Sequence, residues 1–288
     1  MSRSHGNHAG NHPVTSAPIQ PRRLVFHGRD HVPITGDFYA PSQHGDAGAP
    51  ALVAVHGGGW KLGTADFYRH WGSYLAENGI AMLAINYRLV ESSKHLHPTG
   101  LDDVCSALDF LSTNAAGLGV DAQRIGLMGD SAGAHLAALA ALSKSEQGAP
   151  GHHGVPVRVM VGVYGVYDML AQWEHDQLAR PEDQITEAVL GVSPLVDKMR
   201  FYQASPLTYT TTRARGTAFL ISWGMEDDTV DCNQSRRFVT ALKQAGCFVR
   251  TLPVPGAPHF WISEPLSDPH GYAARLAPVL LRFLDERL

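Results

Sequence analysis

The sequence predicts an α/β protein built on a mostly parallel sheet flanked by helices. Short, continuous apolar runs recur along the chain, and segments with apolar residues at helical spacing separate them. Strands that flanking helices bury on both faces have such runs, and strands that alternate with helices specify a parallel sheet. The 288 residues suit one large domain, which we expect at residues 22–288.

The first half of this domain opens with a predicted hairpin at the sheet edge. Residues 22–39 alternate apolar and polar side chains around Pro33 and Gly36, which is typical of antiparallel strands. Buried strands are expected next, with helices between them and Gly79 as a helix stop. The predicted strands are 51–55, 80–85 and 124–128, and the predicted helices are 65–78 and 102–114.

The second half continues the alternation but contains one irregular segment. Residues 168–215 hold Trp173, a weakly helical stretch at 184–190 and several turn residues. Long irregular segments of this kind often serve as lids, so we expect a small lid or cap there. The flanking elements are predicted as a helix at 134–143, strands at 157–164, 218–222 and 248–252, and helices at 233–245 and 271–288.

The composition argues against several kinds of partner and structural feature. The net charge is −4, and Lys and Arg are scattered instead of gathered into a basic stripe, so nucleic acid is not expected. No run reaches the roughly 18 apolar residues of a membrane span. The three cysteines are an odd number without CxxC spacing, which argues against a disulfide framework and a zinc site.

The N-terminal residues 1–21 are predicted to form a disordered tail. They carry His5, His8 and His12 among Ser, Gly, Asn and Pro, and nothing holds these histidines in the geometry of a metal site. No apolar run there has the character of a secretory signal. With the unpaired cysteines, this predicts a cytoplasmic protein without a bound metal.

Residues 129–133 read Gly-Asp-Ser-Ala-Gly and lie between a predicted strand and a predicted helix. This G-x-S-x-G pattern in a strand–turn–helix context is typical of a nucleophile elbow around Ser131. Glycines are needed because the turn is tight. The start of the helix favours the negative charge that develops at the serine.

Two further loops carry candidate site residues. His-Gly-Gly-Gly-Trp at 56–60 follows a buried strand, and its glycines let backbone N–H groups approach a substrate and form an oxyanion hole; His56 is expected to be structural. Glu226, Asp227 and Asp228 compete as the acid after strand 218–222. His259 is preferred as the base over His270, which falls too near the final helix.

These motifs resemble those of the α/β-hydrolase superfamily. The likeness runs from about residue 24 to the C-terminus and is specific to esterases related to hormone-sensitive lipase and to the carboxylesterase, feruloyl-esterase-like and kynurenine-formamidase-like group. It implies the α/β-hydrolase fold with the chain order nucleophile, acid, histidine. The family pattern G-x-x-D-x-x-V, here with Gly224 and Val230, favours Asp227 as the acid.

The resemblance also implies a reaction. Ser131 would attack a carbonyl with His259 as general base and Asp227 orienting the histidine, while the amides of Gly58, Gly59 and Ala132 hold the oxyanion. No cofactor is required. The substrate would be a small-molecule ester or amide. Formation of a homodimer is left open.

Two alternatives remain open beside a carboxylic ester hydrolase. An arylformamidase or other C–N hydrolase would use the same triad, and a ligand-binding member of the fold would keep the pocket without the chemistry. The substrate itself is unspecified, although Trp60, Phe260 and Trp261 lie beside the catalytic loops and are candidates for the pocket. A polar cluster is interpreted as scaffold and comprises Asn86, Tyr87, Arg88, Asp102 and Asp103.

Overall fold

The computed structural model describes residues 18–288 except 44, 92–93, 95, 144–150 and 152. Its described part contains one eight-stranded sheet with the spatial order β1-β2-β4-β3-β5-β6-β7-β8. β1 and β2 form the expected antiparallel edge hairpin, β2 pairs antiparallel with β4, and the remaining neighbours pair in parallel. The strands are β1 (Arg22–His27), β2 (Pro33–Tyr39), β3 (Ala49–Val55), β4 (Ala81–Asn86), β5 (Val120–Asp130), β6 (Val157–Val163), β7 (Ala218–Gly224) and β8 (Val249–Val254).

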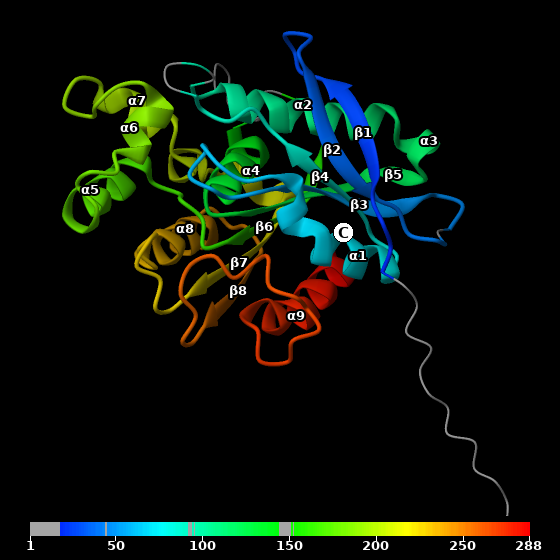
Figure 1. Ribbon diagram of the computed structural model, residues 1–288. Coiled ribbons are helices and arrows are strands. Elements are labelled where there is room, and N and C mark those ends of the chain that lie inside the picture. Colours follow the sequence, from blue (N-terminus) through cyan, green and yellow to red (C-terminus); the bar gives the residue numbers. More distant parts are fainter. Residues whose placement is uncertain (1–17, 44, 92–93, 95, 144–150, 152) are drawn as a thin grey trace, which may run out of the picture.

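Helices cover both faces of this sheet, and a helical insertion follows β6 (Figure 1). α1 (Arg69–Glu77) and α9 (Tyr272–Arg287) pack on one face, and α2 (Thr99–Thr113), α4 (Ala132–Ser143) and α8 (Asn233–Gln244) pack on the other. No helix in the described part of the chain is long and apolar enough to cross a membrane. The other helices are η1 (Ala65–Tyr68), α3 (Ala115–Leu118), α5 (Met169–Ala179), α6 (Ile185–Leu190), α7 (Lys198–Gln203), η2 (Pro206–Tyr209) and η3 (Thr212–Gly216).

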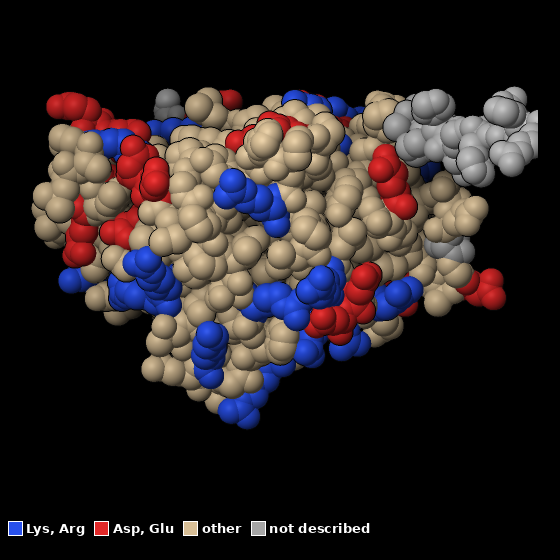
Figure 2. All heavy atoms as spheres, turned by 90° about the horizontal axis from the view of Figure 1, so that it is seen from below, with Lys and Arg blue, Asp and Glu red and all other residues tan. Residues whose placement is uncertain are grey.

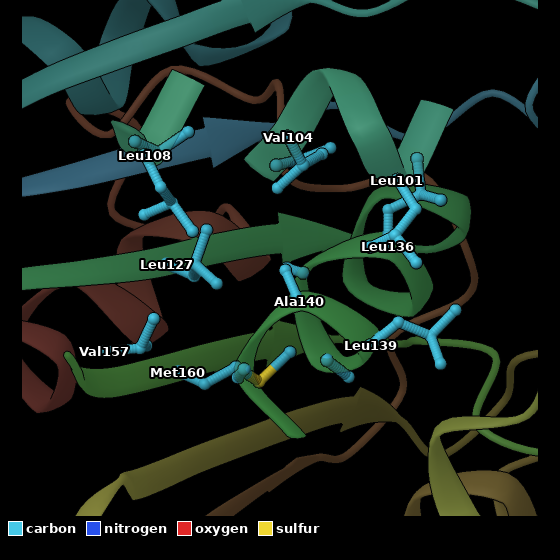
Figure 3. Close-up of a cluster of buried hydrophobic side chains, with 14 of the residues drawn as sticks. Leu101, Val104, Leu108, Leu127, Leu136, Leu139, Ala140, Val157 and Met160 are labelled. Carbon is cyan, nitrogen blue, oxygen red and sulfur yellow. The ribbon is translucent and has the colours of Figure 1, made fainter. Parts of the chain in front are cut away.

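The strand β3 shows why its sequence is apolar throughout. Its alternate residues point to opposite faces, so Val53 contributes to the core under α2 and α4, while Leu52 contributes to the core under α1 and α9. Both side chains are fully buried. Figure 3 shows the first of these cores, where leucines of α2 and α4 meet side chains of β5 and β6. The mostly parallel sheet flanked by helices is thus confirmed.

Several helices differ from the sequence prediction in their bounds or were not predicted. The helix expected at 65–78 is split into η1 and α1, and α2 begins at Thr99 instead of residue 102. The insertion holds α5 and α7, which apolar spacing did not predict. α5 has a local signal, since the side chain of Asp168 caps it by accepting from the backbone N–H groups of Leu170 and Ala171.

The N-terminal tail lies partly outside the described residues, which begin at residue 18. The last four residues of the predicted tail lie against α1, where the backbone N–H of Ile19 donates to Ser73 Oγ over 2.9 Å. Ile19 also packs against the core under α1 and α9. Ile19, which the sequence placed in the tail, therefore contacts the folded domain.

Charged side chains of both signs are mixed on the face in Figure 2, where Lys and Arg lie among Asp and Glu. Among the described residues, several oppositely charged side chains form ion pairs. Arg23 contacts Asp37 at 2.6 Å and Arg250 contacts Glu286 at 2.9 Å. Arg250 and Glu286 are partly exposed, with side-chain exposures of 27% and 42%, and ion pairs of this kind contribute little to stability.

Within the predicted scaffold cluster, Arg88 and the buried Asp103 form a polar network beside β4, whereas Asp102 is partly exposed. Asp103 on α2 is fully buried and accepts from the backbone N–H of Arg88 at 2.8 Å and from its guanidinium Nε at 3.0 Å. The carboxylates of Asp103 and Asp30 raise the pKa of Arg88. Asn86 accepts from the backbone N–H of Ala65 at 2.8 Å and so fixes the start of η1.

Replacing Asp103 with alanine is expected to lower the free energy of unfolding by about 3–5 kcal/mol, because the Arg88 charge would lose its buried partner. Chemical denaturation of wild type and variant measures the loss. Asp102→Ala is the matched control one residue away. Asp102 and its partner Arg29 are partly exposed, with side-chain exposures of 35% and 42%, so we expect a loss below about 1 kcal/mol. Equal losses in the two variants would contradict this interpretation.

Candidate active site

Ser131 lies in the tight turn between β5 and α4. Its φ angle is +50°, a left-handed conformation that is costly for a residue with a side chain. The flanking glycines make the turn sterically feasible, because a Cβ on Gly133 would collide with the carbonyl of Val55 and a Cβ on Gly129 would collide with Gly133. The strain and the close packing hold the serine hydroxyl at the carboxyl edge of the sheet.

Ser131, His259 and Asp227 form a continuous hydrogen-bonded chain. The Ser131 Oγ lies 3.0 Å from His259 Nε2, and His259 Nδ1 lies 2.6 Å from Asp227 Oδ2. A proton on Nδ1 donates to the carboxylate and leaves Nε2 free to accept from the serine hydroxyl. Ser131 and His259 are only 7% and 6% exposed. The geometry therefore suits proton transfer from serine to histidine.

The loop after β7 fixes the Asp227 carboxylate. Its Oδ1 accepts from the backbone N–H groups of Thr229 at 3.0 Å and Val230 at 2.9 Å, which leaves Oδ2 for His259. The competing candidates in this loop, Glu226 and Asp228, are both exposed. His270, the other candidate base, is exposed as well and lies outside the chain of hydrogen bonds.

The glycine loop after β3 lies beside Ser131. Gly58 and Gly59 have φ angles of +112° and +58°, and both line the same cavity as Ser131 and Ala132. In the described part of the chain, the backbone N–H groups of Gly58, Gly59 and Ala132 have no hydrogen-bond acceptor. The loop is held from its other side, where the Gly58 carbonyl accepts from the N–H of Leu62 at 2.9 Å. Three N–H groups that line the cavity beside Ser131 thus have no acceptor among the described residues.

Asp130 connects the nucleophile turn to this glycine loop, a role that the sequence analysis missed. Its buried Oδ1 accepts from the Gly57 N–H at 2.9 Å and from the Tyr68 hydroxyl at 3.0 Å. Burial raises the pKa of the Asp130 carboxyl to about 6. Its position inside the Gly-Asp-Ser-Ala-Gly motif was visible in the sequence, but its partners were not.

Two aromatic residues support the histidines near the site. The Tyr164 ring lies 4.4 Å from the His259 ring, and its hydroxyl accepts from the Ile262 N–H at 3.0 Å, which anchors the loop that carries the base. His56 stacks on Tyr87 at 4.5 Å. Burial lowers the pKa of His56 to about 4. His56 bonds within its own loop, to the Gly57 carbonyl, as expected of a structural residue.

A cavity of about 390 Å³ opens beside Ser131. Trp60 and Phe260, two of the aromatic candidates, line it. Trp261 does not: its side chain is buried in the core under α1 and α9, where it packs edge-on against Tyr164 at 5.2 Å. The lining comprises Gly58, Gly59, Trp60, Lys61, Leu62, Ser131, Ala132, Val166, Gln172, Asp176, Arg180, Asp183, Ile185, Thr229, Val230 and Phe260.

Trp60 is held in the cavity wall by His135 on α4. The indole Nε1 donates to His135 Nδ1 at 3.2 Å, and His135 Nε2 lies 2.7 Å from the Ala204 carbonyl. The ring must be neutral to accept from Trp60. Burial agrees with this, since it lowers the pKa of His135 from 6.5 to about 4.

This depressed pKa predicts a pH-dependent contribution to stability. Between pH 6.5 and about pH 4, His135 is protonated in the unfolded chain but stays neutral in the folded protein. The contribution of neutral His135 to the free energy of unfolding is therefore fully present above pH 6.5 and is lost as the pH falls through this window. The stability difference between wild type and His135→Gln should therefore shrink between about pH 7 and about pH 4.5. Denaturant titrations at both pH values measure it, and a difference that stays constant would refute the assignment.

Comparisons with known proteins agree with this architecture. The BD-FAE family matches residues 37–242. The probable carboxylic ester hydrolase LipM of Mycobacterium tuberculosis is 34% identical over an alignment of 203 residues, which covers 68% of this chain and 45% of LipM. The chain thus spans about half the length of the first curated relatives that it matches.

Solved structures extend the likeness to nearly the whole chain. A thermophilic esterase of the Planctomycetes species Thermogutta terrifontis has a TM-score of 0.73 and 25% identity, covering 93% of this chain and 92% of its own. Carboxyl esterase 2 of the mycorrhizal fungus Tuber melanosporum has a TM-score of 0.76 and 22% identity, covering 96% and 89%, and supports the fold alone.

The resemblance to α/β-hydrolase esterases is therefore confirmed at the level of family and fold. The family match covers well over half of the 288 residues and includes the glycine loop and the nucleophile turn. This chain belongs to the BD-FAE family and has the α/β-hydrolase fold.

Proposed function

We propose that this protein is a serine hydrolase that cleaves carboxylic esters through an acyl-enzyme on Ser131. The observation that carries the proposal is the hydrogen-bonded chain from Ser131 through His259 to Asp227, next to three N–H groups without acceptors among the described residues. The names of relatives such as LipM, a probable carboxylic ester hydrolase, support an ester as the substrate.

The reaction proceeds in two halves. His259 accepts the proton of the Ser131 hydroxyl as the oxygen attacks the ester carbonyl, and it then protonates the departing alcohol. A water molecule, activated by the same histidine, releases the acid from the serine. Asp227 stabilises the charged imidazole in both halves.

The oxyanion of each tetrahedral intermediate lies against the N–H groups of Gly58, Gly59 and Ala132. Donors that are already oriented stabilise this charge without reorganisation. Asp130 assists by holding Gly57, the residue before these donors, at 2.9 Å. No metal or other cofactor enters this mechanism.

Residues 168–215 act in this proposal as a cap that closes the substrate cavity. Their helix α5 contributes Gln172 and Asp176 to the lining, Arg180 follows directly after α5, and α6 contributes Ile185. The cytoplasmic location and the homodimer stay predictions from the sequence.

Turnover of three substrates tests the proposal. Wild type and Ser131→Ala are compared on p-nitrophenyl butyrate, methyl ferulate and N-formylkynurenine. We expect serine-dependent hydrolysis of at least one of the two esters, with slower turnover of the formamide. Hydrolysis of N-formylkynurenine alone would replace the proposal with an arylformamidase. A folded wild type that hydrolyses none of the three and does not react with a serine-directed phosphonate would support a ligand-binding protein.

A further inference from the structure

Three side chains bind the cap helix α5 to the loop that follows β7. Gln172 and His175 lie three positions apart on α5 and so share a face, and Arg180 follows directly after the helix. Gln172 Nε2 and Arg180 Nη2 both donate to the Thr229 carbonyl, at 3.0 Å and 2.9 Å. His175 Nε2 lies 2.9 Å from the Asp228 carbonyl and must carry the proton, since a carbonyl oxygen can only accept. The cap thus holds two consecutive carbonyls of this loop.

The two carbonyls belong to the same peptide units as the two N–H groups that hold the Asp227 carboxylate. The Asp228 carbonyl and the Thr229 N–H form one unit, and the Thr229 carbonyl and the Val230 N–H form the next. Both N–H groups donate to Asp227 Oδ1, at 3.0 Å and 2.9 Å. In a planar trans peptide unit the C=O and N–H bonds point in opposite directions. Each unit therefore has the cap on its carbonyl side and the carboxylate on its N–H side.

A planar peptide unit transmits a constraint from one side to the other. A rotation that turned the Val230 N–H away from the carboxylate would also break the bonds from Gln172 and Arg180. Hydrogen bonds at the carbonyl also polarise the amide and strengthen the bond that its N–H donates. The second carboxylate oxygen, Asp227 Oδ2, lies 2.6 Å from His259 Nδ1. The direction of the two N–H donors therefore sets where this oxygen meets the imidazole.

Asp176 orients both donors of the Thr229 carbonyl. Its side chain is only 3% exposed, and its Oδ1 accepts from Gln172 Nε2 at 2.9 Å and from Arg180 Nη2 at 2.6 Å. Hydrogen bonds to a charged partner are shorter and stronger than bonds between neutral groups. Each donor is thus fixed at two points, the buried carboxylate and the carbonyl. This arrangement favours a single orientation of the peptide unit between Thr229 and Val230.

We propose that α5 positions the catalytic acid, because its side chains hold the two peptide units that orient the Asp227 carboxylate toward His259. The positioning residues are His175, Gln172 and Arg180, and they act on the reaction through the acid alone. This inference rests on the proposed ester hydrolysis. It gives the cap a second role, in kcat, beside its role in closing the substrate cavity.

Two substitutions each loosen one of the peptide units. His175→Phe keeps an aromatic ring but removes the donor to the Asp228 carbonyl, and Arg180→Met removes one of the two donors to the Thr229 carbonyl. We expect kcat on p-nitrophenyl butyrate to fall about threefold in His175→Phe and about tenfold in the combined variant, because the carboxylate is held less firmly. KM should stay near that of wild type in His175→Phe, since His175 is not among the described residues that line the cavity.

Arg88→Met is the matched control for Arg180→Met. Arg88 also pairs with a buried aspartate, Asp103, but it lies outside the cap and has no hydrogen bond to the loop after β7 among the described residues. Unfolding transitions establish that both variants are folded under the assay conditions. The kcat of Arg88→Met should stay near that of wild type, whereas a general effect of losing a buried ion pair would lower kcat in both variants.

A double-mutant cycle distinguishes positioning of the acid from a purely structural role of the cap. The combined variant is compared with its parent in the wild-type background and in the Asp227→Ala background, which has no carboxylate to position. We expect the loss of about tenfold in kcat to disappear in the second background, so that the two rates there have a ratio of about one. A structural role would lower kcat by the same factor in both backgrounds.

Several outcomes would overturn the inference. An unchanged kcat in the combined variant, or equal losses in the two backgrounds, would do so while leaving the proposed ester hydrolysis intact. A rise in KM at constant kcat would assign the α5 side chains to substrate binding instead. A wild type that hydrolyses no ester would reject both proposals. If Arg180→Met does not fold, the half-buried His175 is replaced alone in the same cycle, and a loss that persists in Asp227→Ala would contradict the inference.

Discussion

Ser131→Ala should lower kcat for ester hydrolysis by about 10⁶-fold, the scale of loss found when a catalytic serine is removed. The oxygen that lies 3.0 Å from His259 Nε2 would be gone, and with it the covalent route. The measurement is the initial rate on p-nitrophenyl butyrate with enough enzyme to detect the residual activity. Some rate above that in water should remain from the oxyanion donors.

Two controls separate chemistry from folding in this experiment. The variant should keep the wild-type unfolding transition, since alanine occupies the same strained turn with a smaller side chain. Ser106→Ala removes another buried serine hydroxyl, which donates to the Asp102 carbonyl at 2.8 Å on α2, far from this chemistry. Its kcat should stay near that of wild type. A folded Ser131→Ala variant with near-normal turnover would reject the proposed nucleophile.

Asp227→Asn should lower kcat by about 10⁴-fold, the second-largest effect that we expect. The asparagine oxygen can still accept from the N–H groups of Thr229 and Val230, which places its NH₂ group against His259 Nδ1. Nδ1 must then accept, so the ring proton moves to Nε2, which can no longer take the proton of Ser131. Asparagine thus keeps the shape of the Asp227 side chain, but it favours the His259 tautomer that cannot accept the proton of Ser131.

Asp228→Asn is the matched control for this prediction. The neighbouring carboxylate is exposed, and its side chain contacts only the Thr229 hydroxyl, at 3.3 Å, among the described hydrogen bonds. We expect a change in kcat of less than about threefold, as for other surface substitutions. A larger loss of kcat in Asp228→Asn than in Asp227→Asn would show that Asp227 is not the catalytic acid.

Much of the fold could be predicted because its signals are local. The continuous apolar run of β3 and the alternation of the β1–β2 hairpin each reflect burial within a few residues. The elbow around Ser131 was predictable for the same reason, since its flanking glycines, strand and helix are neighbours in sequence. The contact that fixes the start of η1 was not, because its acceptor, Asn86, lies on β4, 21 positions further along the chain.

The substrate cavity was much less predictable. Two of its polar lining residues, Gln172 and Arg180, donate to the Thr229 carbonyl, which lies 57 and 49 positions further along the chain. No sequence pattern marks such contacts. Trp60 and Trp261 both stand beside candidate catalytic residues in the sequence, yet only Trp60 lines the cavity. The backbone at Phe260, with φ +65°, turns its side chain outward and leaves the next residue in the core. Adjacency in the sequence therefore did not distinguish pocket from core.

The covalent step on Ser131 is the central claim, and mass spectrometry after reaction with paraoxon tests it most directly. We expect one diethylphosphoryl group per chain, carried by the peptide that contains Ser131, with the loss of ester hydrolysis following the extent of labelling. Ser131→Ala should remain unlabelled under the same conditions. Complete inhibition with the Ser131 peptide unmodified, or labelling of another residue in step with the loss of activity, would contradict the account.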